Sequence, residues 1–180
     1  MKEYKLLITG TMGAGKTTAI RAISDTAPIV TDVANHDSSV DKARTTVGLD
    51  YGVLALDNGD RIRLFGTPGQ ARFDFLWQIL AKNALGLVIL IDNSRPDPLA
   101  DLAMFLDGFA THLETLPCVI GVGRTETHAA TTLDHYADAL EARGMVFPIL
   151  PVDVRQRADV ISLIDTLLGQ IEAGMDMDLQ

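Results

Sequence analysis

Apolar and polar positions alternate in blocks along the chain, and the blocks predict strands and helices in regular succession. Continuous apolar runs, typical of strands buried on both faces, occupy residues 4–9, 87–91, 118–122 and 147–152. Apolar residues at helical spacing predict helices over residues 16–24, 73–83, 99–113, 132–143 and 158–173. This alternation indicates an α/β fold in three layers, with helices on both faces of a mostly parallel sheet.

Two stretches depart from the alternation. Residues 51–56 and 61–65 are short apolar runs joined by Asp57-Asn58-Gly59-Asp60, whose Asn-Gly pair predicts a hairpin and therefore one antiparallel strand. Residues 25–48 are polar and without a clear period, which predicts a long loop that is functional or mobile. The expected sheet has six strands in a single domain over residues 1–174, and residues 175–180 form a short acidic C-terminal tail.

The most specific motif lies between the first strand and the first helix. Residues Gly10 to Thr17 read glycine, four residues, then Gly-Lys-Thr, which is the pattern of a phosphate-binding loop. The glycines let backbone N–H groups face a phosphate chain, and the helix start adds partial positive charge. In this pattern Lys16 reaches the outer phosphates and the Thr17 hydroxyl binds Mg²⁺.

Composition narrows the possible partners and compartment. The formal net charge is −9, which argues against nucleic acid or anionic lipid as the main partner. The single cysteine, Cys118, lies in an apolar run and is expected to be a core residue, which favours a cytoplasmic setting. No membrane span, signal peptide or lipid-anchor motif is expected from the sequence.

The succession of phosphate loop, long polar loop, hairpin and second glycine loop resembles that of the Ras-like small GTPases over the whole chain. The nearest resemblance is to bacterial Mgl-type and conservon-type GTPases, which occur beside roadblock-fold proteins. It implies the G domain of a P-loop NTPase that binds GTP or GDP with Mg²⁺ and hydrolyses GTP slowly. It also implies a roadblock-type protein as activator or regulator.

The resemblance assigns roles around the triphosphate. The phosphate loop would bind nucleotide through Gly10, Gly13, Ala14, Gly15, Lys16, Thr17 and Thr18. Met12 either crowds the γ-phosphate and slows hydrolysis or packs against the neighbouring loops. Residues 45–51 resemble switch I, so Thr46 would meet Mg²⁺ and the γ-phosphate. Arg44 is either an arginine finger in cis or a solvated charge.

Residues 65–73 resemble switch II. Gly69 would donate its N–H to the γ-phosphate, and Gln70 would orient the attacking water. Gly66 stands where Ras-like proteins usually have the aspartate that holds Mg²⁺ through water. The metal is then held more weakly, or another acid helps; the candidates are Asp32, Asp37 and Asp50.

The base-binding motifs depart furthest from the family. Residues 121–126 stand where most GTPases have Asn-Lys-x-Asp; here Arg124 would stack on the base and Glu126 would accept hydrogen bonds from guanine. Asp153, Val154 and Arg155 replace Ser-Ala-Lys, with Arg155 closing over the base. Two alternatives therefore stand beside the GTPase hypothesis. They are an ATP-binding ATPase or phosphotransferase, and a pseudo-GTPase that binds nucleotide without turnover.

Overall fold

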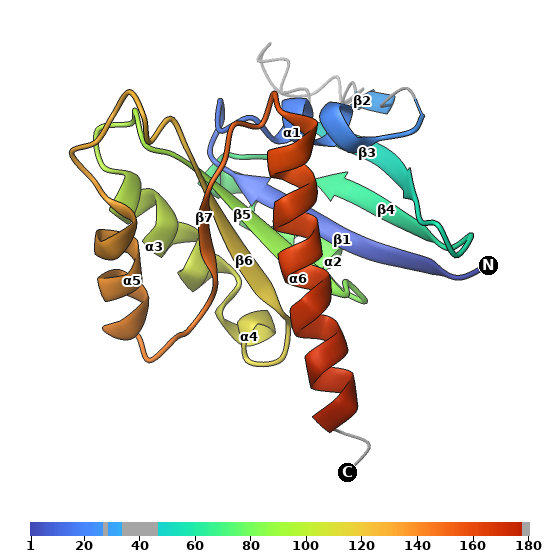
Figure 1. Cartoon of the computed structure of the whole chain (residues 1–180). Helices are drawn as coiled ribbons and strands as arrows, with labels where there is room; N and C mark the ends of the chain where they lie inside the picture. Colours follow the sequence, from blue (N-terminus) through green and yellow to red (C-terminus); the bar gives the residue numbers. More distant parts are fainter. Residues whose placement is uncertain (27–28, 34–46, 178–180) are drawn as a thin grey trace.

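The computed structural model describes residues 1–26, 29–33 and 47–177, and within these ranges the chain forms a seven-stranded sheet (Figure 1). The strands lie in the order β2-β3-β4-β1-β5-β6-β7. Their bounds are β1 (Glu3–Gly10), β2 (Ile29–Val33), β3 (Val47–Ala55), β4 (Arg61–Gly66), β5 (Gly86–Asp92), β6 (Cys118–Gly123) and β7 (Ile149–Pro151). Among the described strands, β3 alone runs in the direction opposite to the others, so its pairings with β2 and β4 are antiparallel. The predicted fold class, mostly parallel with one antiparallel strand, is confirmed.

The sheet has one strand more than the six expected, because β2 lies within the stretch predicted to be a loop. It pairs with β3 from Ile29 opposite Tyr51 to Val33 opposite Val47. Four of its five residues are β-branched, which favours a strand. Asp32 and the polar flanks interrupt the apolar run that would have revealed it. The rest of the predicted loop, residues 34–46, lies outside the described residues.

The predicted hairpin is confirmed as β3 and β4, which pair from Asp50 opposite Gly66 to Ala55 opposite Arg61. Its turn is closed by a hydrogen bond from the Gly59 N–H to the Leu56 carbonyl at 2.9 Å. Gly59 has a φ of 84°, a backbone conformation that glycine adopts without strain.

Helices cover both faces of the sheet and divide the core into two clusters (Figure 1). One face carries α1 (Lys16–Ile23) and α6 (Arg157–Met177), which pack on the alternate strand residues such as Leu6, Ile8 and Val88. The other face carries α2 (Asp74–Ala81), α3 (Pro98–Gly108), α4 (Ala110–Leu113) and α5 (Leu133–Glu141). Cys118 is fully buried in this second cluster, as predicted.

The helices lie where they were predicted, with ends that differ by a few residues, and three differences change the picture. The helix predicted over residues 99–113 is broken at Phe109 into α3 and α4. The helix predicted from residue 73 begins as a short 3-10 turn, η1 (Ala71–Phe73). The last helix continues to Met177, past the predicted end at residue 173, and residues 178–180 lie outside the described part. No described helix is long and apolar enough to cross a membrane.

The parallel strands place the predicted site residues along one edge of the sheet. β1 ends at Gly10, β4 at Gly66, β5 at Asp92 and β6 at Gly123, and these four strands lie side by side. Ligands of open α/β sheets bind beyond the carboxyl ends of the strands. The loops that follow these four residues therefore form the candidate site.

Candidate functional site

The predicted phosphate loop connects the carboxyl end of β1 to the first residue of α1. Gly15 precedes the helix with a φ of 95°, in the left-handed region. A Cβ on Gly15 would lie 2.6 Å from Val154 Cγ2, and one on Gly10 would lie 2.3 Å from the Leu90 carbonyl oxygen. Both positions therefore exclude a side chain, and the loop packs tightly against β5 and the loop after β7.

Lys16 is folded across this loop. Its ammonium donates hydrogen bonds to the carbonyls of Gly10 at 2.7 Å and Thr11 at 2.8 Å, and the residue is only 9% exposed. Burial lowers the pKa of Lys16 to about 8, and the charge of Asp50 opposes this shift. The amine is thus held at the loop in a poorly solvated position, where an anion would stabilise its charged form.

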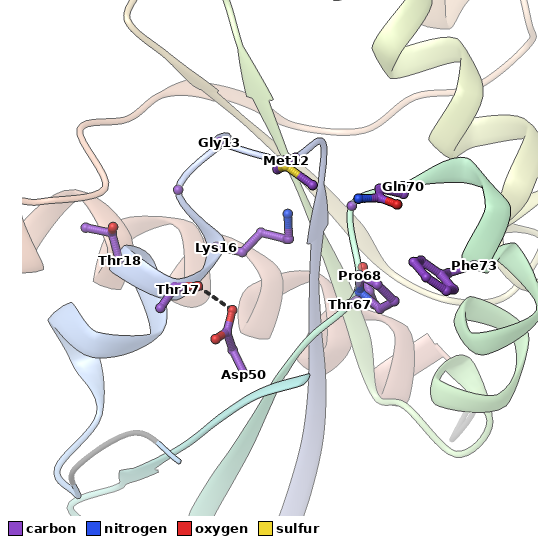
Figure 2. A pocket seen from close by; sticks show the side chains of 12 residues that line it. Met12, Gly13, Lys16, Thr17, Thr18, Asp50, Thr67, Pro68, Gln70 and Phe73 are labelled. Carbon is purple, nitrogen blue, oxygen red and sulfur yellow. Dashed lines mark hydrogen bonds between the residues drawn. The ribbon is translucent and has the colours of Figure 1, made fainter. Parts of the chain in front are cut away.

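Asp50 lies beside the predicted magnesium ligand. The Thr17 hydroxyl donates a hydrogen bond to Asp50 Oδ2 at 2.5 Å (Figure 2). Asp50 pairs with Gly66 across β3 and β4, and a Cβ on Gly66 would lie 2.9 Å from the Asp50 Cβ. Of the three candidate acids, Asp32 belongs to β2 and Asp37 lies outside the described residues. The structure thus brings Asp50 to the space next to Gly66.

The second glycine loop closes the other side of the same cavity. A Cβ on Gly69 would lie 2.6 Å from the Met12 backbone nitrogen, so this loop touches the phosphate loop directly. Gln70 and Lys16 both line the resulting cavity of ≈ 360 Å³ (Figure 2). Met12 is 64% exposed at this position. Arg44 and Thr46 lie outside the described residues.

A second cavity of ≈ 760 Å³ lies on the other side of the phosphate loop. The two cavities share Gly13, Gly15 and Thr18, so together they follow the loop and the start of α1. Six more residues predicted to bind nucleotide line this second cavity: Ala14, Arg124, Glu126, Asp153, Val154 and Arg155. All the described residues that were predicted to bind nucleotide, Lys16 included, therefore lie at one edge of the sheet, and Gln70 lies there too.

Both arginines of the larger cavity are paired with aspartates. Arg124, whose φ of 61° is unusual for a side-chain-bearing residue, pairs with Asp92 and donates to Ser94 Oγ at 3.0 Å. Arg155 donates to both oxygens of Asp153 at 2.8 Å, and these hydrogen bonds lower the pKa of Asp153 to about 2. The arginines are therefore held at the cavity wall by fixed negative charge.

The pairing of Asp92 with Arg124 was not predicted, because the two residues are far apart in the chain and meet only through the pairing of β5 with β6. Asp92 also caps the loop after β5, because its carboxylate accepts a hydrogen bond from the Ser94 N–H at 2.9 Å. Burial alone would raise the pKa of Asp92, but hydrogen bonds from Ser94 and Arg124 lower it overall. The next residue, Asn93, accepts from the buried Tyr136 hydroxyl at 2.6 Å and donates to the Thr131 carbonyl at 2.8 Å. These contacts fix the loop between β6 and α5.

The side chains at the phosphate loop do not form a protein-only metal site. Among the described residues, no three His, Cys, Asp or Glu side chains are grouped so that they could hold a metal ion. Thr17 and Asp50 together offer a hydroxyl and a carboxylate, both oxygen donors of the kind that Mg²⁺ prefers. A magnesium ion here would need further oxygen ligands, such as phosphate oxygens and water.

Comparison with known proteins supports the predicted resemblance to Ras-like proteins. No family model matches the chain. Ras-related protein RabC of Dictyostelium discoideum is 21% identical over 178 residues, which cover 96% of this chain and 85% of RabC. Intraflagellar transport protein 22 of Chlamydomonas reinhardtii is 27% identical over 64% of this chain, and an uncharacterised protein of Methanocaldococcus jannaschii is 29% identical over 52% of it.

The chain is similar to Ras-related proteins at low identity. It spans 53% of the archaeal protein's length and 59% of the intraflagellar transport protein's length. The similarity agrees with the three-layer fold and with the phosphate loop at the end of β1.

Proposed function

We propose that the chain is a single-domain guanine-nucleotide switch that hydrolyses GTP slowly with Mg²⁺ and acts in the cytoplasm. The observation that carries this proposal is the pair of cavities that meet at Gly13, Gly15 and Thr18. The smaller cavity offers a lysine and hydroxyl groups for phosphates and metal. The larger one offers room and hydrogen-bonding groups for a base and sugar. The similarity to Ras-related proteins supports a nucleotide as the ligand, with its phosphates in the smaller cavity and its base and sugar in the larger one.

In this proposal the phosphates lie along the phosphate loop. Backbone N–H groups between Gly13 and Thr18 face them, at the positive end of α1. Lys16, already held at the loop by hydrogen bonds to two carbonyls, would supply a positive charge to the outer phosphates. Thr17, whose hydroxyl now donates to Asp50, would turn its oxygen to the metal. Bound Mg²⁺ would neutralise charge on the outer phosphates.

Asp50 takes the place of the aspartate that the resemblance leads one to expect at Gly66. The two positions are directly opposite in the β3–β4 pair, and Gly66 leaves the space that the Asp50 side chain fills. We assign Asp50 the role of orienting the metal's water shell, together with Thr17 as a direct ligand. Thr46 would complete the set from switch I.

Hydrolysis would proceed by in-line attack of a water molecule oriented by Gln70, with the Gly69 N–H on the γ-phosphate. Gln70 lines the phosphate cavity, but no side-chain hydrogen bond in the described part of the chain fixes it there. A catalytic group held so loosely supports slow intrinsic turnover. A roadblock-type partner would press Gln70, and Arg44 with it, into the productive position.

The larger cavity would take guanine. Glu126 and Arg124 both line this cavity; Glu126 would accept hydrogen bonds from the base, and Arg124 would cover one face of it. Gly123 and Glu126 are unlike the usual guanine-binding motif, and this departure favours ATP binding as the second candidate function. Against this alternative, a base that lacks the hydrogen-bond donors of guanine would leave the Glu126 carboxylate without a partner on the base.

A nucleotide-affinity panel tests the proposal. The dissociation constants of GTP, GDP, ATP and ADP are measured by calorimetry, each with and without Mg²⁺. We expect GTP to bind at least about tenfold more tightly than ATP, a difference of about 1.4 kcal/mol. Mg²⁺ should strengthen GTP binding. Equal affinity for GTP and ATP would refute the guanine-specific form and favour the ATP-binding alternative.

A further inference from the structure

The loop that carries Gly69 and Gln70 is anchored on two sides. On the β1 side, the Thr67 N–H donates to the Ile8 carbonyl at 3.0 Å, and the buried hydroxyls of Thr67 and Thr9 are 2.6 Å apart. These bonds fix where the loop leaves β4. They do not reach the residues that follow Thr67.

The second anchor comes from α2. The Trp77 Nε1–H donates to the Pro68 carbonyl at 2.8 Å, and Trp77 is 1% exposed. Pro68 has no backbone N–H, so its carbonyl is the only polar group it offers for anchoring. If the loop moved away, the buried indole N–H would lose its partner, which is unfavourable. The bond therefore favours one position of the loop.

The Trp77 ring is itself held by α3 and by Phe109, the residue that follows it. It stacks on Phe109, with ring centroids 5.6 Å apart and an interplanar angle of 7°, and lies 4.9 Å from the Phe105 ring. A Cβ on Gly108 would lie 2.7 Å from Trp77 Cζ3, so the glycine makes room for the indole. The indole thus has little freedom to rotate.

Gly69 directly follows the anchored Pro68. It contacts the phosphate loop closely enough that a Cβ on it would lie 2.7 Å from the Gly10 carbonyl oxygen. The placement of Gly69 against the phosphate loop is therefore the geometric consequence of two fixed neighbours, Thr67 and Pro68.

We infer that Trp77 is a positioning residue: its indole, clamped by α3, sets where Gly69 and Gln70 lie against the phosphate loop. This inference rests on the proposed function, because it gives α2 and α3 a part in recognising the γ-phosphate. Trp77 acts through Pro68 and lines neither cavity of the candidate site.

Two variants and a control test the inference. Trp77→Phe keeps an aromatic ring in the stack but removes the N–H donor. Gly108→Ala keeps the donor but places a methyl group against the indole. Gln170→Leu is the matched control, because it also removes a side-chain donor to a backbone carbonyl, that of Cys118 at 3.1 Å, where β6 begins at the opposite edge of the sheet.

The measurement is the ratio of the GDP dissociation constant to that of a non-hydrolysable GTP analogue, both with Mg²⁺. We expect Trp77→Phe and Gly108→Ala to lower this preference for triphosphate about fivefold to tenfold, the scale of one hydrogen bond. The GDP affinity of these two variants should stay as in wild type. The control Gln170→Leu should keep the wild-type preference for triphosphate. A purely structural role would weaken GDP and the analogue alike.

The outcomes separate this inference from the function beneath it. If the wild-type chain binds neither guanine nucleotide, the proposed function fails and the inference with it. If wild type prefers the triphosphate and Trp77→Phe keeps the same preference, only the inference is overturned. Should Trp77→Phe not fold, Gly108→Ala decides: Trp77, the single tryptophan, reports by its fluorescence whether the indole has shifted. A shifted emission with an unchanged preference overturns the inference.

Discussion

Asp50 and Gly66 face each other across the β3–β4 pair, and the carboxylate of Asp50 accepts a hydrogen bond from the Thr17 hydroxyl at 2.5 Å. In the proposed function, this carboxylate on β3 stands in for the aspartate that Ras-like proteins usually carry at the position of Gly66. The glycine and the aspartate form a complementary pair, because a side chain on Gly66 would overlap that of Asp50.

Replacing Asp50 by Asn should weaken the effect of Mg²⁺ on GTP binding. The amide still accepts the Thr17 hydrogen bond but lacks the negative charge that orients the metal's water shell. We expect the apparent Mg²⁺ affinity of the GTP complex to fall about tenfold or more, the usual effect of losing such a supporting group. Titrating Mg²⁺ against the GTP-bound protein measures this. Asp57→Asn, in the exposed hairpin turn, is the control and should change nothing.

Exchanging the two residues tests the complementarity itself. Gly66→Asp alone should lower the melting temperature, because its Cβ would lie 2.9 Å from that of Asp50. Combining Gly66→Asp with Asp50→Gly should restore stability and much of the Mg²⁺ dependence. If the double variant responds to Mg²⁺ as weakly as Asp50→Asn does, an acid at position 66 cannot replace one at position 50. That result would contradict our assignment.

Lys16 should make triphosphate binding take up protons. Burial lowers its pKa to about 8 in the folded chain, against an ordinary value of 10.5. Phosphate oxygens favour the charged amine, so binding at about pH 8 should take up about half a proton, and almost none at about pH 6.5. Calorimetry in buffers of different ionisation enthalpy measures the uptake. Equal uptake at both pH values would contradict the assignment of Lys16 to the phosphates.

The same shift predicts how the stability of the nucleotide-free protein changes with pH. Between about pH 8 and 10.5 the unfolded chain keeps the Lys16 proton while the folded chain has lost it. The free energy of unfolding contributed by this group therefore rises with pH across that window. Lys16→Met should flatten the rise, as denaturant titrations at several pH values would show.

Gln70→Ala separates a GTPase from a pseudo-GTPase. We expect the single-turnover rate of GTP hydrolysis to fall at least about tenfold, because the water loses its orienting group. GTP affinity should stay within about twofold of wild type, since Gln70 acts on the water and not on the bound phosphates. If the variant and the wild type lose bound GTP at the same rate, turnover by Gln70 is refuted.

Glu126→Ala should remove the preference for guanine. Losing hydrogen bonds to a charged acceptor costs about 1.5–3 kcal/mol, so GTP affinity should fall about tenfold or more. Affinity for inorganic tripolyphosphate, which lacks a base, should not change. Glu141→Ala, at the exposed end of α5, is the matched control. A parallel loss of GTP and tripolyphosphate affinity would place Glu126 outside the base-binding group.

Local features of the site were predictable from the sequence, and features that depend on strand pairing were not. The phosphate loop was predictable because Gly10, Lys16 and Thr17 lie close together in the chain, at the spacing that is typical of such a loop. The hairpin followed from Asn58-Gly59 in the same way. The link from Thr17 to Asp50 depends on the register of β3 against β4, so Asp50 was only one of three acids that the sequence offered.

Trp77 both packs in the core and donates a hydrogen bond, and the second role was not predictable from the sequence. Trp77 belongs to the amphipathic helix predicted over residues 73–83, and the structure buries it in the core. Its hydrogen bond to Pro68 depends on how α2 lies over the loop, which no local pattern encodes. β2 was missed because its β-branched residues are too few, between polar neighbours, to give a periodic signal.

The burial of Cys118 has a practical consequence for following the loops of the site in solution. The thiol is fully enclosed between the sheet and its helices, and burial raises its pKa above the ordinary value. Reactivity of cysteine depends on exposure and on the thiolate form, and Cys118 has neither. A cysteine introduced at an exposed position such as Phe75 on α2 could therefore carry a fluorescent or spin label selectively, with the native thiol left in place.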